Sequence, residues 1–313
     1  MNKDSIVMGI DTSNYTTSVA LVTLDGRLVA NIKAPLPVKA GECGLRQSDA
    51  VFAHIKNIPE CMARAREALD GRIPVAVGVS KRPRNVEGSY MPCFLSGVSV
   101  AEGISASLGI PIYYFSHQCG HVMSALYSSG NISMMKGEFG AFHVSGGTTD
   151  LLRITPSENG FCAERVGGTS DLNAGQAIDR IGVRMGLSFP CGRELEALAL
   201  QNTAKIPTKR VKCENLKISL SGLENMAERL LSETQDKALV SAFTLDYIYR
   251  GISALADAYI ERYGAGRLIF SGGVMSNSII KEKLIKKYDA GFAEPSLSAD
   301  NAVGIAVLTS LKF

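Results

Sequence analysis

The chain of 313 residues is long enough for one large domain or two domains of ordinary size. Its 46% hydrophobic and 20% charged residues are typical of a globular protein and exclude a disordered chain. With 33 basic against 30 acidic residues the charge is nearly balanced, which argues against a polybasic binding protein.

The cysteines and the N-terminus bear on the compartment. The seven cysteines form no CxxC pair, which argues against a zinc ribbon or a redox dithiol and favours a reduced, cytoplasmic protein. The opening residues, MNKDSIVMGID, lack the long apolar stretch of a signal peptide, and no run of about 18 apolar residues occurs anywhere. We therefore expect a cytoplasmic protein without a membrane span.

The first half of the chain alternates between β-rich and helical patterns. Residues 6–24, IVMGIDTSNYTTSVALVTL, hold two β-rich runs around a small polar turn, which predicts a hairpin. Apolar residues at helical spacing predict a helix over 47–70, although Pro59 disfavours a helix at that point. The other elements expected in this half are, in chain order, a strand at 73–80, a helix at 94–109, a strand at 110–116 and a helix that starts at His117.

The hairpin pattern returns in the second half. Residues 139–155, FGAFHVSGGTTDLLRIT, show a strand, a turn rich in Ser, Thr and Gly, and a second strand, as residues 6–24 do. This internal repeat predicts two duplicated lobes, 1–133 and 134–313, and leaves open whether the last helix returns to the first lobe. The second lobe is expected to contain helices at 170–187, 192–204, 219–234 and 237–263, a strand, Gly turn and helix at 267–277, and a last helix near Asp300. Strands that alternate with helices predict an α/β fold.

His117-Gln118-Cys119-Gly120-His121 is the sharpest local signal. Two histidines four residues apart project from one face of a helix and can share a metal ion. Asp300, after a loop, is the candidate third ligand, whereas Cys119 should point off the histidine face. One core histidine and one surface histidine remain the alternative interpretation. Because Gln118 stands where a zinc peptidase carries Glu, a metalloprotease is disfavoured.

Two Gly turns follow predicted strands and favour phosphate binding. Ser145-Gly146-Gly147-Thr148-Thr149 and Ser271-Gly272-Gly273-Val274 let backbone N–H groups approach phosphate oxygens, and the turn at Asp11-Thr12-Ser13 adds hydroxyl donors. Each pair of glycines alone can be only a tight turn. The chain has neither GxxxxGK[ST] nor GxGxxG, which excludes a P-loop and leaves a Rossmann site unsupported.

Charged residues on the remaining segments admit a functional and a structural interpretation. Asp179 shares a helix face with Gly175 and could bind ribose hydroxyls, or it could lie on a solvated face paired with an arginine. Basic runs at 81–84, 205–217 and 281–287 are typical of solvated faces, although together they could guide a polyanion.

The ordered motifs resemble one family over residues 6–308. GIDTSNYTTSVAL, HQCGH, HVSGGTTDLL, NAGQAIDR, GLSFPCG, ISLSGLEN, FSGGVMSN and ADNAVGIA are similar to the tRNA threonylcarbamoyladenosine transferases, formerly called O-sialoglycoprotein endopeptidases or glycoproteases. The resemblance implies the actin-like fold of sugar kinases and heat-shock ATPases, with two ribonuclease-H-like lobes and a nucleotide in the cleft between them.

The resemblance also implies the ligands and their residues. One Fe or Zn ion would be bound by His117, His121 and Asp300. The adenylate or ATP-type nucleotide would be contacted by residues that match the family's binding positions, together with the Gly turns and Asp11 noted above: Val144, Ser145, Gly146, Gly147, Thr148, Asp179, Gly192, Gly272, Gly273 and Asn277. No catalytic residue is assigned. Expected partners are an adenine nucleotide, tRNA, and either proteins of the tRNA-modifying complex or a second copy of the chain, and no membrane.

Several positions depart from the family pattern. SGGHTQL is SGGTTDL here, so Thr148 replaces a histidine, and FSFSGLKT is ISLSGLEN, so Glu224 replaces a lysine. GESIDDAAGEAFDK becomes GGTSDLNAGQAIDR, with Gly168 among the altered surroundings and acidic residues lost. These departures leave three functions to weigh: transfer of threonylcarbamoyl to the N6 amine of a tRNA adenosine, a nucleotide-binding scaffold with weakened catalysis, and a carbamoyl transferase or kinase of the same fold.

Overall fold

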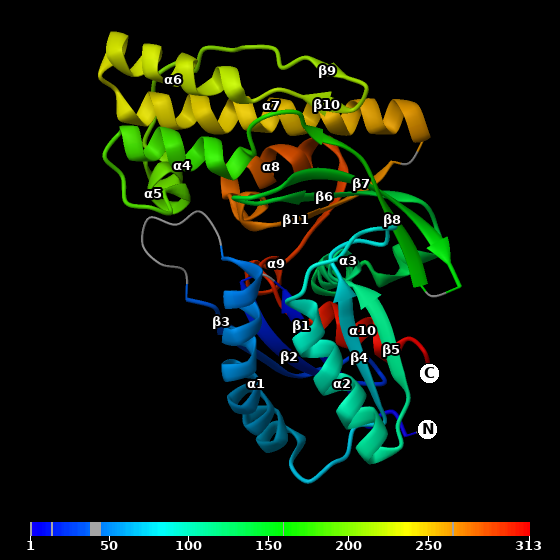
Figure 1. Ribbon diagram of the computed structural model, residues 1–313. Coiled ribbons are helices and arrows are strands. Elements are labelled where there is room, and N and C mark those ends of the chain that lie inside the picture. Colours follow the sequence, from blue (N-terminus) through cyan, green and yellow to red (C-terminus); the bar gives the residue numbers. More distant parts are fainter. Residues whose placement is uncertain (1, 14, 38–44, 159, 265) are drawn as a thin grey trace. The chain divides into compact units, whose positions relative to one another are not determined.

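The computed structural model describes residues 2–13, 15–37, 45–158, 160–264 and 266–313 (Figure 1). Asn14, in the turn of the first expected hairpin, lies outside them. The chain divides into two compact units. Unit 1 comprises Met1–Ile132, Pro156–Ala163 and Ala299–Phe313, and unit 2 comprises Ser133–Thr155 and Glu164–Ser298. The C-terminal segment therefore packs with the N-terminal part of the chain.

A five-stranded mixed sheet forms the centre of unit 1. Its order is β3-β2-β1-β4-β5, with β1 antiparallel to β2 and parallel to β4. The strands are β1 (Ile6–Ser13), β2 (Thr16–Thr23), β3 (Leu28–Pro35), β4 (Ala76–Arg82) and β5 (Ile112–Ser116). Because the carboxyl ends of β1, β4 and β5 lie at one edge, polar residues that follow these strands are brought together.

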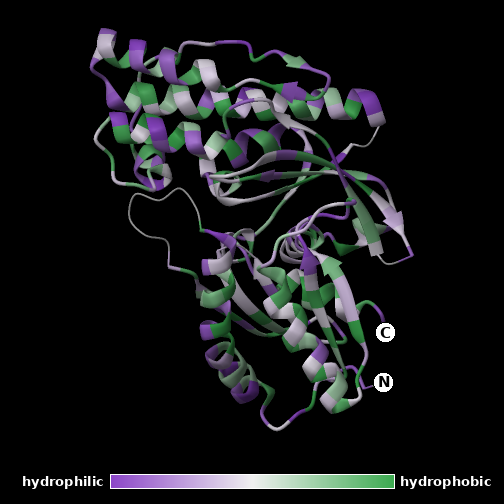
Figure 2. Ribbon diagram, viewed as in Figure 1, coloured by the Kyte–Doolittle hydropathy of each residue, from purple (hydrophilic) through white to green (hydrophobic). Residues whose placement is uncertain are grey.

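Helices cover both faces of this sheet. Alternate residues of β1 pack against α1 and α2, while Gly9 lies against α10, where an added Cβ would come within 2.5 Å of the Ala306 amide nitrogen. The helices of unit 1 are α1 (Gln47–Leu69), α2 (Phe94–Leu108), α3 (His117–Ser128) and α10 (Val303–Ser310). In Figure 2 the strands of unit 1 are mostly hydrophobic, whereas hydrophobic and hydrophilic residues alternate along α1.

Unit 2 contains the larger sheet. Seven strands run in the order β12-β11-β6-β7-β8-β10-β9, with β11 parallel to β6 and β12. The strands are β6 (Phe139–Val144), β7 (Thr149–Ser157), β8 (Gly160–Thr169), β9 (Cys213–Glu214), β10 (Lys217–Ile218), β11 (Arg267–Ser271) and β12 (Asp289–Phe292). The tip of the β7–β8 hairpin is counted with unit 1.

The helices of unit 2 pack on one face of its sheet. Phe142 stacks on Phe270, and Phe270 on Phe292, with ring centroids 4.8 and 4.9 Å apart, and these rings join a large apolar core. The helical elements are α4 (Ala174–Arg184), α5 (Gly192–Leu200), α6 (Ser221–Thr234), α7 (Lys237–Tyr263), α8 (Ser278–Lys287) and α9 (Pro295–Ser298), and there are two 3₁₀ turns, η1 (Ile132–Lys136) and η2 (Gly273–Ser276).

Several element boundaries differ from the prediction for physical reasons. α1 continues through Pro59 without ending. The helix predicted at 170–187 is only α4, because Asp171 instead accepts hydrogen bonds from Ser219 and the Leu220 amide. The last helix begins at Val303, whose N–H donates to the Asn301 side chain (2.9 Å), rather than near Asp300.

Two further boundaries were wrong, and some strands were absent from the prediction. The helix predicted at 192–204 ends at Leu200, and the helix predicted within 267–277 starts only at Ser278, after the 3₁₀ turn η2. Strands β3, β8, β9, β10 and β12 were not predicted; the residues of β3, LVANIKAP, are neither alternating nor uniformly apolar, and β9 and β10 have only two residues each.

Two broader expectations concern membrane-spanning helices and the state of the cysteines. Within the described ranges no helix is both long and apolar enough to cross a membrane. The six cysteines that the structure describes are all free thiols.

Candidate metal centre and nucleotide loops

The two histidines occupy the first two turns of α3. Strand β5 delivers the chain to Ser116, whose hydroxyl accepts a hydrogen bond from the Cys119 N–H (3.2 Å) and caps the helix. His117 is the first helical residue, and His121 follows one turn later on the same face. The strand-to-helix junction therefore fixes where both imidazole rings project.

His117, His121 and Asp300 converge. The two Nε2 atoms lie 3.0 Å apart, and Asp300 Oδ1 lies 3.1 Å from His121 Nε2 and 3.5 Å from His117 Nε2. Ligand atoms about 2.1 Å from a common ion lie roughly 3.0–3.5 Å from one another. The three side chains thus fit a metal ion, and imidazole with carboxylate is a donor set that suits Fe or Zn.

Residues at the end of β1 and β4 hold these side chains in place. Asp11 Oδ1 lies 3.0 Å from His117 Nδ1 and also accepts a hydrogen bond from the Ser80 hydroxyl. The Ser13 hydroxyl donates to Asp300 Oδ2 (3.1 Å). A carboxylate on Nδ1 fixes the imidazole tautomer that presents the Nε2 lone pair to a metal. Asp11, which we expected to contact the nucleotide, therefore contacts His117, and its contact with a nucleotide stays a prediction.

The cluster is strongly coupled electrostatically. Burial alone would lower the pKa of His117, but Asp11 and Asp300 outweigh burial and raise the pKa to about 10. Burial would likewise raise the pKa of Asp300, yet the hydrogen bonds and charges of His117 and His121 hold it well below its usual range. Asp11 Oδ2 is buried with no hydrogen-bond partner among the described residues. The two carboxylates therefore favour a positive charge among these side chains, and a metal ion would supply that charge when it displaces the proton from His117.

Cys119 faces away from the histidines, as expected. It is buried, and its Sγ accepts a weak hydrogen bond from Asn85 Nδ2 (3.7 Å). Burial raises the pKa of the thiol, so Cys119 stays protonated at neutral pH.

In unit 2 the first Gly turn is open on its ligand side. The Ser145 N–H donates to the Thr148 carbonyl (2.8 Å), which closes the turn between β6, ending at Val144, and β7. An added Cβ at Gly146 or Gly147 would meet no atom within 4 Å. Beyond the turn itself, no atom of the described chain therefore fills the space on the Cβ side of these two glycines.

The start of α4 supports this turn through residues that we did not predict as site residues. Asn173 Nδ2 donates to the Gly147 carbonyl (2.9 Å), and the Gly175 N–H donates to the Ser145 carbonyl (3.3 Å). A Cβ on Gly175 would lie 2.6 Å from Gly146 Cα, so only glycine allows this approach. The run NAG, which is the N-cap and the first two residues of α4, is the sequence signal for this contact. The contact directs the helix N-terminus toward the turn.

The second Gly turn packs against the first. Gly272 has φ +96°, and a Cβ there would lie 2.3 Å from the Val144 carbonyl oxygen, whereas Gly273 is open. Asn277 is buried, and its side-chain oxygen caps α8 by accepting from the Ile280 N–H (3.1 Å). The structure thus brings together 144–148, 272–273 and the start of α4, and the 3₁₀ turn η2 that leads to Asn277 contacts α4.

Asp179 and Gly192 also lie together. Asp179 Oδ1 accepts from the Cys191 N–H (2.8 Å), which places it at the start of α5 beside Gly192. Burial raises the Asp179 pKa, and the Cys191 bond opposes that shift. The surface pair with Arg180 that we weighed as an alternative does not form, because Arg180 is directed to Glu224.

Glu224 does not bring an uncompensated charge to the nucleotide loops. Its side chain is 15% exposed and lies 2.6 Å from Arg184 and 3.4 Å from Arg180, both on α4. The acidic replacement at this position is therefore paired with two guanidinium groups, one of which, that of Arg184, also pairs with Glu228.

Solved structures establish the fold. The chain matches component A of (R)-2-hydroxyglutaryl-CoA dehydratase from Acidaminococcus fermentans at TM-score 0.56 and 17% identity, over 98% of each chain. It matches HypF from T. kodakarensis at TM-score 0.61 and 13% identity, over 99% of this chain but 47% of HypF, and thus spans about half of that protein. A ROK family protein from Streptococcus pneumoniae aligns at TM-score 0.55 with 12% identity, over 98% of each chain. The expected actin-like fold is confirmed.

Sequence comparisons establish the family. Curated proteins from Streptococcus suis (strain 05ZYH33) and Streptococcus pneumoniae serotype 2 (strain D39), each described as tRNA N6-adenosine threonylcarbamoyltransferase, are 28% identical to this chain. The alignments cover 98% and 97% of this chain and 92% and 91% of those proteins. The family model of the same description matches residues 40–307. The chain therefore belongs to the tRNA N6-adenosine threonylcarbamoyltransferase family.

Proposed function

We propose that the protein transfers a threonylcarbamoyl group from its adenylate to the N6 amine of an adenosine in tRNA, with one Fe or Zn ion bound by His117, His121 and Asp300. The observation that carries the proposal is the convergence of the two Nε2 atoms and Asp300 Oδ1 within 3.5 Å of one another. These ligands come from distant parts of the chain, and Asp11 supports one of them, as carboxylates commonly do behind metal-binding histidines.

The residues of unit 2 would hold the adenylate. The backbone at Gly146, Gly147 and Gly273 has open space on its Cβ side. Its N–H groups would bind the phosphate, and the N-terminus of α4 would add a favourable dipole. Asp179, at the start of α5, can accept hydrogen bonds from ribose hydroxyls. In this arrangement backbone N–H donors, and not a cationic side chain, would stabilise the negative charge on the AMP leaving group.

The reaction is an acyl transfer. The N6 lone pair attacks the carbonyl carbon of the threonylcarbamoyl group, the bond from that carbon to the phosphate oxygen breaks, and AMP leaves with the electron pair while N6 loses a proton. A bound Fe or Zn ion supplies Lewis acidity toward a carbonyl or phosphate oxygen. Asp11 holds the His117 ring through Nδ1, and Ser13 holds Asp300, so the ligand set is preorganised.

A second candidate is a nucleotide-binding scaffold with weakened catalysis. Thr148 stands beside the phosphate turn where the family carries a histidine, and loss of one charge-assisted contact to a leaving group costs on the order of 3 kcal/mol, or about two decades of rate. A carbamoyl transferase or kinase acting on another substrate would use the same fold and the same open turns.

Reconstitution separates these functions. The purified protein is combined with threonylcarbamoyl-adenylate, Fe or Zn and unmodified tRNA, with and without the family's partner proteins, and the digested tRNA is analysed for the modified nucleoside. We expect a small amount of the modified nucleoside with the protein alone, a larger amount with the partner proteins, and none with His117→Ala. Tight ADP binding without product under either condition would contradict the transferase and support the scaffold.

A further inference from the structure

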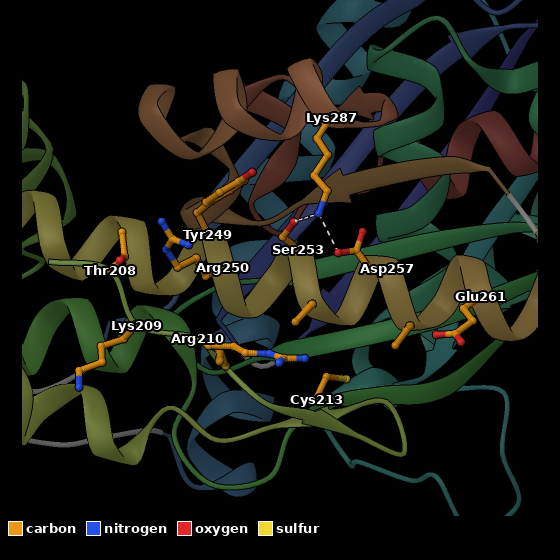
Figure 3. A pocket seen from close by; sticks show the side chains of 13 residues that line it. Thr208, Lys209, Arg210, Cys213, Tyr249, Arg250, Ser253, Asp257, Glu261 and Lys287 are labelled. Carbon is orange, nitrogen blue, oxygen red and sulfur yellow. Dashed lines mark hydrogen bonds and ion pairs between the residues drawn. The ribbon is translucent and has the colours of Figure 1, made fainter. Parts of the chain in front are cut away.

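A surface pocket of about 590 Å³ lies on unit 2, away from the Gly turns in sequence (Figure 3). One wall is a stripe of α7 that runs from Arg250 to Glu261, and the other is the segment 208–213. Lys287, the last residue of α8, closes the upper rim in Figure 3 and donates to Ser253 (2.9 Å) and Asp257 (2.7 Å). The pocket is therefore built by three segments of one unit.

Small side chains on α7 create the hollow. Ser253, Ala254 and Ala258 occupy the middle of the stripe, at the spacing of one helix face. The segment opposite is anchored because Val211 is buried in the core of unit 2 and Cys213 begins β9, which contacts α7. The stripe of twelve residues from Arg250 to Glu261 is about 16 Å long, so the hollow is an elongated groove.

Residues from two basic runs of the sequence lie together at this groove. Lys209 and Arg210 come from the run at 205–217, and Lys287 comes from the run at 281–287. Lys209 and Arg210 form no ion pair with any residue that the structure describes. In Figure 3 the Arg210 side chain extends along the groove below α7.

Cations outnumber anions along the walls. Asp246, which does not line the groove, is shared by Arg250 and Lys283, each 2.6 Å from one of its oxygens, so one carboxylate faces two positive charges. Asp257 is already engaged by Lys287 and by the Tyr288 hydroxyl (2.6 Å). Glu261, at the far end, is the remaining acidic residue of the lining.

We infer that this groove binds the sugar–phosphate backbone of tRNA. Arg210 and Lys209 would contact phosphate oxygens, and the engaged Asp257 would not repel them. The inference rests on the proposed function, because it takes tRNA as the substrate and assigns it a docking surface on unit 2. Contacts of this kind release counterions, so binding weakens as the salt concentration rises.

Charge reversal tests the groove directly. Binding of an unmodified tRNA transcript to the metal-loaded full chain is measured by fluorescence anisotropy between about 50 and 200 mM salt. We expect Arg210→Glu to weaken binding about tenfold and to reduce the slope of log K against log salt by about one, and Glu261→Lys to strengthen binding. Arg66→Glu, an equal charge change at an exposed position on α1 in unit 1, serves as the matched control and should change neither value strongly.

The outcomes separate this inference from the proposed function. Equal losses for Arg210→Glu and Arg66→Glu would show that only net charge matters and would overturn the groove. Normal tRNA binding by Arg210→Glu, in a protein that modifies tRNA, would overturn the groove and leave the function intact. A wild-type protein that neither binds nor modifies tRNA would overturn both. Unchanged ADP binding by Arg210→Glu shows that the variant is folded.

Discussion

The candidate site of unit 1 is made of side chains, and that of unit 2 is made of backbone. In unit 1, His117, His121 and Asp300 are each held by a second polar group or by one another, and the whole cluster is partly or fully buried. In unit 2, an added Cβ at Gly146 or Gly147 would meet no atom of the described chain outside the turn, so a ligand can approach the backbone there. One site depends on which functional groups are present, and the other depends on which groups are absent.

The two sites therefore tolerate different kinds of substitution. Removing a ligand atom disables a metal cluster, whereas small changes of neighbouring volume do not. Adding a Cβ disables a phosphate turn, whereas the chemistry of the added atom matters little. The two sites can therefore be broken one at a time, and each break predicts which binding function survives.

Removal of a metal ligand should have the largest effect. We expect the wild-type protein to hold about one Fe or Zn ion per chain and His117→Ala to hold almost none, because two ligands without the third bind weakly. Elemental analysis of the purified proteins measures this. ADP binding by the same variant should be unchanged, and an unaltered metal load in His117→Ala would show that the ion is held elsewhere.

A Cβ in the open part of a Gly turn should have the next largest effect. We expect Gly146→Val and Gly273→Val to weaken ADP binding about 100-fold, which corresponds to about 2.7 kcal/mol. Both positions are open in the folded chain, so stability should be kept. Calorimetry gives the affinity, and wild-type affinity in both variants would refute the assignment.

Gly272→Ala is the contrasting variant of the same turn. Its Cβ would collide with the Val144 carbonyl, and the residue has φ +96°, so it should lower the free energy of unfolding by about 1–3 kcal/mol. A loss of ADP binding through unfolding is thereby distinguished from a loss through blocked approach.

A change behind the metal ligands should have a smaller effect than loss of a ligand. Asp11→Asn keeps the shape of the side chain but removes the charge that orients His117 through Nδ1. Loss of such a supporting carboxylate typically weakens metal affinity 10–100-fold. Competition with a chelator measures the affinity, with Ser18→Ala, which loses only a hydrogen bond to the Asp11 carbonyl, as the control. Equal affinities for Asp11→Asn and wild type would mean that Asp11 does not orient the ring.

The side-chain site was more predictable from sequence than the supports of either site. Two histidines at helical spacing are a local signal, and the Gly turns directly follow strands, so both could be found without a fold. The contact of Asp11 with His117 joins residues more than one hundred positions apart through the order of β1, β4 and β5. The fit of Gly175 against Gly146 and the pairing of Glu224 with Arg184 likewise exist only once α4 is placed.

The smallest predicted effect concerns the stability of unit 2. Asp171 lies at an exposed position before α4; burial would raise its pKa, but hydrogen bonds from Ser219 and the Leu220 N–H lower it well below its usual range. Because the folded pKa is below the unfolded value of about 3.9, the carboxylate stabilises the fold above that pH, and the stabilisation is lost as the pH falls through the folded pKa.

Asp171→Asn should therefore lower the free energy of unfolding at pH 7 by only about 1 kcal/mol, since solvent screens the exposed carboxylate. Urea unfolding of wild type and variant at pH 7, 5, 4 and 3 measures the difference, which should be constant down to about pH 4 and shrink below it. Metal content should be the same in both proteins, because the ligands lie in unit 1. A stability difference that does not change with pH would show that the geometry of the two hydrogen bonds, and not the charge of Asp171, anchors the start of α4.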